Sequence, residues 1–373
     1  MRYSKVFIDA IGYELAPNVV TTEEIEDKLK PFYDAVGFKK GQLLALTGIK
    51  ERRYWDINHT LAEGAAKAGQ KAIDAAGVTP DQIECVVFCG VGRDGFEPAT
   101  ACAVADALNV SPNAHVYDVS NACLGVVTGM VHVANAIEIG QIKAGLVVSC
   151  ETARQIVEST IDEINQAKSV DFYKQTIATM TGGSGAVGVL MTNGTLGNQG
   201  IRRHALIGGV VKQASRFNNL CKWTFSEPGM PTTAKIRMRT DAHAVLENGL
   251  ALARETYDLF IEQMQLINKI ESPQQTDKQS KPQSSKKIDV HNKPDKFICH
   301  QVGSTHQQMV HQALNIDPAT DFSTYQYLGN IGTVSLPLTA AIADECGFLK
   351  HGDYVGFMGI GSGLNCLILG LKW

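Results

Sequence analysis

Short apolar runs alternate with segments of helical periodicity along the first half of the chain. The runs 82–89, 116–119 and 144–149 are short and rich in apolar residues, which is typical of strands that are covered on both faces. Between them, 99–108 and 124–139 carry small and apolar residues at helical spacing. Strands that alternate with helices in this way predict an α/β fold in which helices cover the sheets.

The pattern around Asn121 recurs around Asn330. Each asparagine follows an expected strand and precedes an expected helix, and the next strand begins 23 residues after it. Repetition of a supersecondary unit at one offset indicates related substructures. The chain is therefore predicted to consist of two related halves, which we place at residues 1–200 and 201–373.

Residues 272–294 interrupt the second half with a polar segment rich in Pro, Ser, Gln and Lys. Such a composition cannot bury enough apolar surface to offset the entropy that is lost on ordering. We therefore expect a flexible surface insertion between a helix at 246–267 and the strand that precedes His300. A segment that binds a partner is the alternative interpretation of the same composition.

The whole chain has the composition of a globular protein with a sizeable core. Of its 373 residues, 44% are hydrophobic and 19% are charged, and the formal net charge is -4. This charge does not favour nucleic acid as a partner, and no uninterrupted apolar stretch reaches the about 18 residues that predict a membrane span. Nine cysteines at irregular spacing and an N-terminus without signal-peptide features predict a reduced, cytoplasmic protein.

Cys85 and Cys89 are separated by three residues, a spacing that invites comparison with a metal site. Their segment has the pattern of a buried strand, whereas zinc ligands usually lie on loops at tighter spacing. Free cysteine also packs well as a small hydrophobic residue. We therefore expect two core cysteines here and no metal.

The candidate nucleophile is Cys123, which lies where an expected strand turns into an expected helix. At the N-terminus of a helix, the positive end of the macrodipole favours the thiolate, which is the nucleophilic form of cysteine. Gly125 and the small residues after it would allow that helix to be buried. From composition alone, a plain core cysteine is the more common interpretation.

Three further segments carry polar groups beside expected strand ends. His300 directly follows a buried strand, where α/β folds place reactive groups, and a hydrogen-bonded core histidine is the alternative interpretation. Asn330 lies in a turn before a helix and by itself indicates a turn or an N-cap. The glycine-rich segment 359–363 can present backbone N–H groups to an anion, but it also suits a tight turn.

Taken together, these segments resemble the thiolase superfamily, and within it the ketoacyl-synthase-III-like condensing enzymes. The resemblance covers nearly the whole chain apart from 272–294. It implies the thiolase fold, in which two pseudo-repeated βαβαβ halves give a five-layer αβαβα architecture. Five motifs carry the resemblance. The N-terminal segment is 47–53 (TGIKERR) and the nucleophile motif is 121–125 (NACLG). The histidine motif is 300–306 (HQVGSTH), the asparagine motif is 329–332 (GNIG) and the oxyanion loop is 359–365 (GIGSGLN).

The segment 93–100 (RDGFEPAT) is similar to the Glu-Pro loop of one branch, the head-to-head acyl-condensing enzymes of long-chain olefin biosynthesis (OleA). The segments 52–56 and 361–366 resemble the same branch. There the glutamate, here Glu97, reaches into the partner subunit's site as a base. The alternative interpretation places Glu97 at the start of the following helix, where the dipole would stabilise its charge. The segment 42–47 lacks the Trp and Arg that elsewhere in the family grip coenzyme A, which argues against tight binding of the usual kind.

The resemblance implies an acyltransferase of lipid metabolism that uses no cofactor and no metal. Cys123 would take an acyl group from coenzyme A or an acyl carrier protein, and the N–H groups of Cys123 and Ser362 would form the oxyanion hole. His300 and Asn330 would donate hydrogen bonds to a second thioester. Glu97 of the partner in a homodimer would remove the α-proton of that thioester, and the product would be a 2-alkyl-3-ketoacyl chain.

Two other functions stay open from the sequence. A 3-oxoacyl-carrier-protein synthase III would condense acyl-coenzyme A with malonyl carrier protein in fatty acid biosynthesis, where loss of CO2 makes the carbanion and no base is needed. A non-catalytic partner subunit with the thiolase fold is the third hypothesis. The joint presence of Cys123, His300 and Asn330 argues against it.

Overall fold

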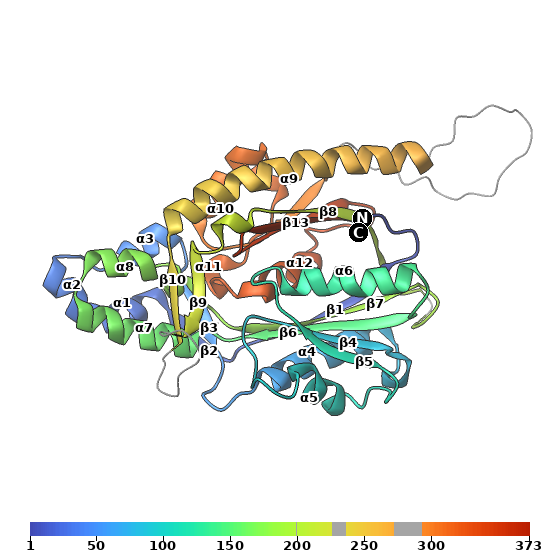
Figure 1. Cartoon of the computed structure of the whole chain (residues 1–373), viewed down its shortest axis with the longest axis horizontal. Coiled ribbons are helices and arrows are strands. Elements are labelled where there is room, and N and C mark those ends of the chain that lie inside the picture. Colours follow the sequence, from blue (N-terminus) through green and yellow to red (C-terminus); the bar gives the residue numbers. More distant parts are fainter. Residues whose placement is uncertain (199, 226–235, 272–292) are drawn as a thin grey trace, which may run out of the picture.

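The computed structural model describes residues 1–198, 200–225, 236–271 and 293–373 (Figure 1). At its centre is a nine-stranded mixed sheet with the strand order β11, β12, β13, β8, β1, β7, β6, β4, β5. In chain order, these strands are β1 (Phe7–Leu15), β4 (Cys85–Cys89), β5 (His115–Val119), β6 (Ala144–Glu151), β7 (Gly185–Thr192), β8 (His204–Gln213), β11 (Lys296–Cys299), β12 (Tyr354–Gly361) and β13 (Asn365–Lys372).

The sheet consists of two units that join where β1 meets β8. This junction holds two residue pairs, Phe7 with Ala205 and Ile8 with His204. Outward from it, β7, β6 and β4 have the same strand directions as β13, β12 and β11, with two antiparallel pairs followed by a parallel one. This arrangement agrees with the repeat in the sequence. The boundary that we place at residue 200 lies in the connection between β7 and β8 and stays a prediction.

Helices pack on both outer faces of the two units and between them. The first outer layer is α4 (Leu61–Ala76) with α5 (Thr100–Ala107), packed on β4, β6 and β7. The central layer is α6 (Gly125–Glu138) with α12 (Ser335–Glu345). The second outer layer is α9 (Ala242–Glu271) with α10 (Ser304–Leu314), packed on β8 and β13. Helix, sheet, helix, sheet and helix thus follow one another, as Figure 1 shows.

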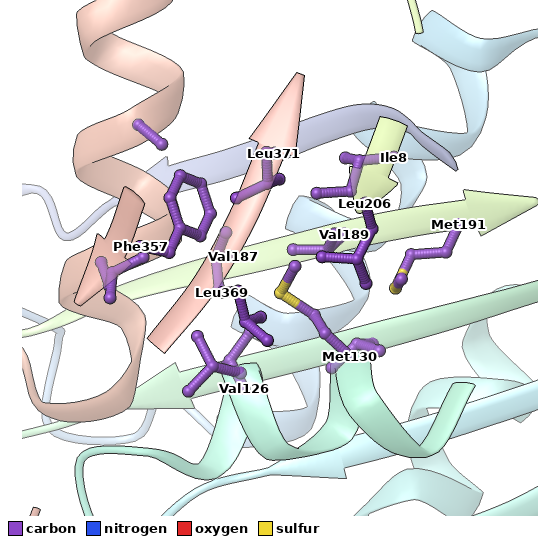
Figure 2. Close-up of a cluster of buried hydrophobic side chains, with 14 of the residues drawn as sticks. Ile8, Val126, Met130, Val187, Val189, Met191, Leu206, Phe357, Leu369 and Leu371 are labelled. Atoms are coloured by element: carbon purple, nitrogen blue, oxygen red, sulfur yellow. The ribbon is translucent and has the colours of Figure 1, made fainter. Parts of the chain in front are cut away.

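The central layer explains why the segment 124–139 is mostly apolar. Val126 and Met130 of α6 point into a cluster that also receives Leu369 and Val189 from strands of the two units (Figure 2). Because α6 packs between two sheets, small and apolar residues occupy most of its circumference, and polar residues such as His132 and Asn135 are exposed. The first turn of this helix, which follows Cys123, is therefore held inside the protein.

The remaining elements gather mainly at one end of the layered core (Figure 1). Two antiparallel ribbons lie there, β2 with β3 and β9 with β10. In chain order, these elements are β2 (Asn18–Thr21), α1 (Thr22–Lys28), α2 (Lys30–Val36), α3 (Gln42–Thr47), β3 (Glu51–Tyr54), α7 (Arg154–Ala167), α8 (Val170–Thr176), β9 (Cys221–Phe225), β10 (Ile236–Thr240) and α11 (Tyr325–Leu328).

Several boundaries differ from those expected. The strand expected at 82–89 begins at Cys85, because Pro80–Gln82 forms a 3-10 turn in which the Thr79 N–H donates to the Gln82 side chain over 3.0 Å. The helix expected at 246–267 spans Ala242–Glu271. The insertion at 272–294 lies outside the described residues except for its last two positions. Among the helices that are described, none is both long enough and apolar enough to cross a membrane.

Candidate active site

Four of the five predicted site residues line one cavity of about 360 Å³: Cys123, His300, Asn330 and Ser362. Cys123 and His300 come from different halves of the chain, and the fold brings them together at the end of the core. Most of the cavity wall is apolar, which suits an acyl chain. Apolar side chains in that wall include Leu46, Ile177, Met238, Leu246, Val302 and Leu364.

Cys123 lies in a tight turn between β5 and α6. The N–H of Leu124 donates to the carbonyl of Asn121 over 2.9 Å, and Gly125 donates to Ala122 over 3.2 Å. Ala122 has φ of 47°, a left-handed conformation that L-residues with a Cβ rarely adopt. Strained backbone of this kind is common at functional sites, where the surrounding structure holds it in place.

The protonation state of Cys123 differs from the expected one. Burial raises the pKa of the Cys123 thiol to about 12, with smaller contributions from the nearby Cys221 and Glu151. The sequence led us to expect a thiolate at the helix N-terminus. In the folded chain, the loss of hydration outweighs the dipole, so the resting side chain is a thiol. A nucleophilic step at Cys123 therefore needs a group that accepts its proton.

His300 follows the last residue of β11, as predicted, and its backbone N–H donates to Met358 over 2.9 Å. Burial, together with the nearby His306, lowers the pKa of the imidazole to about 3. The ring is therefore neutral at pH 7 and carries one N–H donor and one acceptor nitrogen. Its Nδ1 is buried and has no hydrogen-bond partner among the described residues. Such a ring can take a proton from a thiol or donate to a carbonyl oxygen.

Asn330 is fixed at both its backbone and its side chain. Its N–H donates to Thr181 over 2.8 Å, and its carbonyl accepts the N–H of Gly183 over 2.9 Å. The side-chain oxygen accepts the N–H of Gly332 over 3.0 Å. The NH2 group donates no hydrogen bond within the described part of the chain. Asn330 can therefore donate a hydrogen bond to a substrate oxygen in the cavity.

Ser362 lies in the reversal between β12 and β13, directly beside the nucleophile turn. A Cβ on Gly361 would lie 3.4 Å from the backbone nitrogen of Cys123, so the two segments approach closely. The Asn365 side chain donates to the Asn121 side chain over 3.0 Å and ties the two turns together. The backbone N–H groups of Cys123 and Ser362 thus belong to adjacent turns, as an oxyanion hole requires.

Glu97 is the exception, because it lies on an exposed loop and does not line the cavity of its own subunit. This loop joins β4 to α5. The alternative interpretation of Glu97 as a residue of the first helical turn is wrong, because α5 begins at Thr100 with Ala99 as its N-cap. Asp118 takes that place and accepts the N–H groups of Thr100 and Ala101 over 3.0 and 2.9 Å.

Comparisons with known proteins place the chain in a family. Models of the 3-oxoacyl-[acyl-carrier-protein] synthase III family match residues 117–206, and those of its C-terminal part match 291–373. Two curated acyl-CoA:acyl-CoA alkyltransferases match over 100% of both chains, one from Shewanella oneidensis at 47% identity and one from Xanthomonas campestris at 31%. The chain belongs to the family of these alkyltransferases. It is an acyltransferase of the synthase-III-like condensing type.

Solved structures of family members confirm the predicted thiolase fold. A crystal structure of Xanthomonas campestris OleA matches with a TM-score of 0.86 and 30% identity, over 100% of this chain and 98% of that chain. Another structure of the same protein, with bound lauric acid and lauroyl-CoA, matches with a TM-score of 0.85. The fold and the enzyme class predicted from the motifs are therefore confirmed.

The predicted set of site residues leaves out several titratable groups near Cys123, among them Cys221, His306 and Glu151. Cys221 and His306 line the cavity, and burial lowers the pKa of His306 to about 4. Glu151 is buried next to the cavity. His306 lies within the quoted histidine motif and could have been found from it. Cys221 and Glu151 carry no local signal, because tertiary contacts alone place them near Cys123.

Proposed function

We propose that this chain joins two fatty acyl thioesters head to head and releases a 2-alkyl-3-ketoacyl thioester. The observation that carries this proposal is the apolar cavity in which Cys123, His300 and Asn330 meet, in a chain that matches an acyl-CoA:acyl-CoA alkyltransferase over its full length. Coenzyme A thioesters are the proposed donors, since lauroyl-CoA is the thioester bound in the related OleA structure. An acyl carrier protein is the alternative donor.

The first half-reaction loads Cys123. Neutral His300 takes the thiol proton as the sulfur attacks the carbonyl carbon of the first acyl thioester. The N–H groups of Cys123 and Ser362 stabilise the oxyanion of the tetrahedral intermediate. The carbon–sulfur bond to coenzyme A then breaks, and the departing thiolate takes the proton back from His300. An acyl-Cys123 thioester and free coenzyme A remain.

The second half-reaction forms the carbon–carbon bond. A second acyl thioester enters, and His300 and Asn330 donate hydrogen bonds to its carbonyl oxygen. Glu97 of the partner removes an α-proton, and the enolate that results is stabilised by those two donors. The α-carbon attacks the acyl-Cys123 carbonyl, and the bond to Cys123 sulfur breaks. Cys123 leaves as a thiolate and recovers a proton from the protonated glutamate.

In this proposal Glu97 acts in the active site of the partner subunit, because it does not line the cavity of its own subunit. The side chain lies on an exposed loop, next to Phe96, which is 81% exposed in the single subunit. The loop adjoins β5, which is the last strand at its edge of the sheet. An edge strand offers unpaired backbone groups to a second copy, and a two-fold axis there would bring each loop to the other subunit. We therefore propose a homodimer.

The variants named in the structures of Xanthomonas campestris OleA support the pairing of Glu97 with Cys123. In that protein a cysteine and a glutamate have been replaced, and the glutamate precedes the cysteine by 26 residues. Glu97 also precedes Cys123 by 26 residues. Equal spacing in two proteins of the same fold is what a shared pair of functional positions would give.

The decarboxylating reaction of a synthase III is the second candidate, and the family models that match the chain favour it. It needs malonyl carrier protein, and it leaves Glu97 without a task. The hypothesis of a non-catalytic subunit is set aside, because the full-length relatives are named as enzymes.

Mass spectrometry of the products separates the two reactions. The purified protein is first incubated with myristoyl-coenzyme A alone, and then with malonyl carrier protein added. Head-to-head condensation gives the 2-alkyl-3-ketoacyl product, or the ketone formed from it, in the first incubation. If a ketoacyl product forms in the second incubation and none forms in the first, the chain is a decarboxylating synthase.

A further inference from the structure

Glu151, the last residue of β6, is a buried carboxylate with no task in the steps above. It is 5% exposed and lies beside the cavity without lining it. Its Oε1 accepts the N–H of Val91 over 3.0 Å. The N–H groups of Gly92 and Thr333 also lower the pKa of the carboxyl group. Three backbone N–H groups therefore favour the charged form of one side chain.

These donors come from the two segments that carry the second half-reaction. Val91 and Gly92 lie near the start of the loop that carries Glu97. Gly332 and Thr333 follow Asn330 directly, and a Cβ on Gly332 would lie 3.3 Å from the Cδ of Glu151. The carboxyl group of Glu151 thus accepts a hydrogen bond from the Glu97 loop and lies against the Asn330 turn.

The Asn330 turn also contacts α6, the helix that follows Cys123. The Thr333 hydroxyl accepts the N–H of Val126, in the first turn of α6, over 2.6 Å. The charge of Glu151 is also one of the causes that raise the pKa of Cys123. Glu151 is therefore close to all three parts of the site, although it contacts no substrate in the proposed mechanism.

A buried carboxylate destabilises a fold unless its hydrogen bonds compensate for the lost hydration. Burial raises the pKa of Glu151 to about 7, and the backbone N–H groups and the Arg93 charge oppose that rise. A neutral side chain could accept a hydrogen bond from one of the two segments and would lose less hydration free energy on burial. A carboxylate can accept from two separate segments at once, because each of its two oxygens has two lone pairs.

We propose that Glu151 is a positioning residue that aligns the Asn330 turn of its own active site and, at the same time, the loop that delivers Glu97 to the partner's active site. The inference rests on the proposed function, in which Glu97 acts in trans. It implies that Glu151 of each subunit affects the geometry of both active sites of the dimer.

Glu151→Gln tests this role, because glutamine keeps the size and loses one acceptor oxygen. Acylation of Cys123, followed by intact-protein mass spectrometry, should stay within about threefold of the wild type. Condensation should fall about tenfold or more, since misplacing a base or a donor by a fraction of an ångström is costly. Asp9→Asn is the matched control, because Asp9 is also a buried carboxylate with a raised pKa but lies in β1, paired with Arg203.

Heterodimers separate the two arms of the proposal. The first subunit carries Cys123→Ala, and the second subunit keeps Cys123. Only the active site of the second subunit can therefore react, and it uses Glu97 of the first subunit. Glu151→Gln on the first subunit disturbs the Glu97 loop alone, and on the second subunit the Asn330 turn alone. Condensation should fall in both heterodimers relative to the one without Glu151→Gln. A loss in one arm alone, or in neither, would overturn the proposal.

Glu151→Asp is the second variant, for use if Glu151→Gln does not fold. It keeps the carboxylate but shortens the side chain by one methylene, which draws the carboxyl group away from the two segments. It should lower condensation and spare acylation in the same way. Failure of the proposed function has a different signature, because the wild-type enzyme would then give no product from acyl-coenzyme A alone. If acylation falls as much as condensation in both variants, Glu151 supports the fold and not the alignment.

Discussion

At the scale of single residues, burial sets the protonation of the two groups that exchange a proton in the proposed acylation. The pKa is about 12 for Cys123 and about 3 for His300. Moving the proton first would create two charges in an apolar cavity, so we expect it to move as the sulfur attacks. The sequence predicted both residues from their motifs. It could not predict their pKa values, because neighbours such as Cys221, 98 residues from Cys123, are placed by tertiary packing.

Alkylation of Cys123 should report its raised pKa. Below the pKa of a thiol, the thiolate fraction rises about tenfold per pH unit. The rate with iodoacetamide should therefore keep rising from about pH 7 to about pH 9. Mass spectrometry of the peptide that contains residue 123 measures this rate, and Cys123→Ser supplies the blank. A rate that levels off below about pH 8 would mean that the helix N-terminus outweighs burial after all.

Asn330→Asp should separate the two half-reactions. Aspartate keeps an oxygen for the Gly332 N–H but loses the NH2 donor and adds a negative charge where the enolate forms. Condensation should fall by about 10²–10³-fold, the usual effect of removing one oxyanion donor. Acylation should change by less than about tenfold, because the N–H groups of Cys123 and Ser362 serve that step. Equal losses in both steps would contradict the role given to Asn330.

At the scale of elements, the site is assembled from strand ends and tight turns. The sequence predicted α5, α6 and β5 within one residue at each end, because their apolar periodicity is regular and their boundaries carry turn residues. It did not predict the β9–β10 ribbon, which supplies Cys221, Met238 and Thr240 to the cavity. That ribbon mixes charged and apolar residues, and Lys222, Trp223 and Thr224 of β9 are exposed in succession. Short strands of this kind have too few residues to show a period.

Glu97→Gln tests the loop between β4 and α5. A carboxylate that removes a weakly acidic α-proton contributes about 10²–10⁴-fold in rate, and glutamine cannot accept that proton. Condensation should fall by that factor while acylation of Cys123 stays nearly intact. Glu255→Gln is a suitable control, because Glu255 is an exposed glutamate on α9 that pairs with Lys212. Condensation at the wild-type rate would reject Glu97 as the base and favour the malonyl-dependent reaction.

At the scale of the whole molecule, the repeat that is visible in the sequence becomes two sheet units with a shared helical layer. Equal spacing between Asn121 and the next strand, and between Asn330 and the next strand, predicted two related halves, whereas the layered architecture was predicted from the family resemblance. The sequence does not determine where Glu97 acts. In the single subunit, Glu97 is exposed and does not line the cavity that contains Cys123, so in the proposed mechanism the complete site depends on how two subunits meet.

Subunit complementation decides this question. Cys123→Ala and Glu97→Gln homodimers should each be unable to condense acyl groups. When the two are co-expressed, half of the dimers are mixed, and each mixed dimer has one site with both Cys123 and the partner's Glu97. The mixture should therefore recover about a quarter of the wild-type condensation rate. If Glu97 served the cavity of its own subunit, no site in the mixture would have both groups and activity would stay absent. Analytical ultracentrifugation should find a dimer at micromolar concentration, and an active monomer would contradict action in trans.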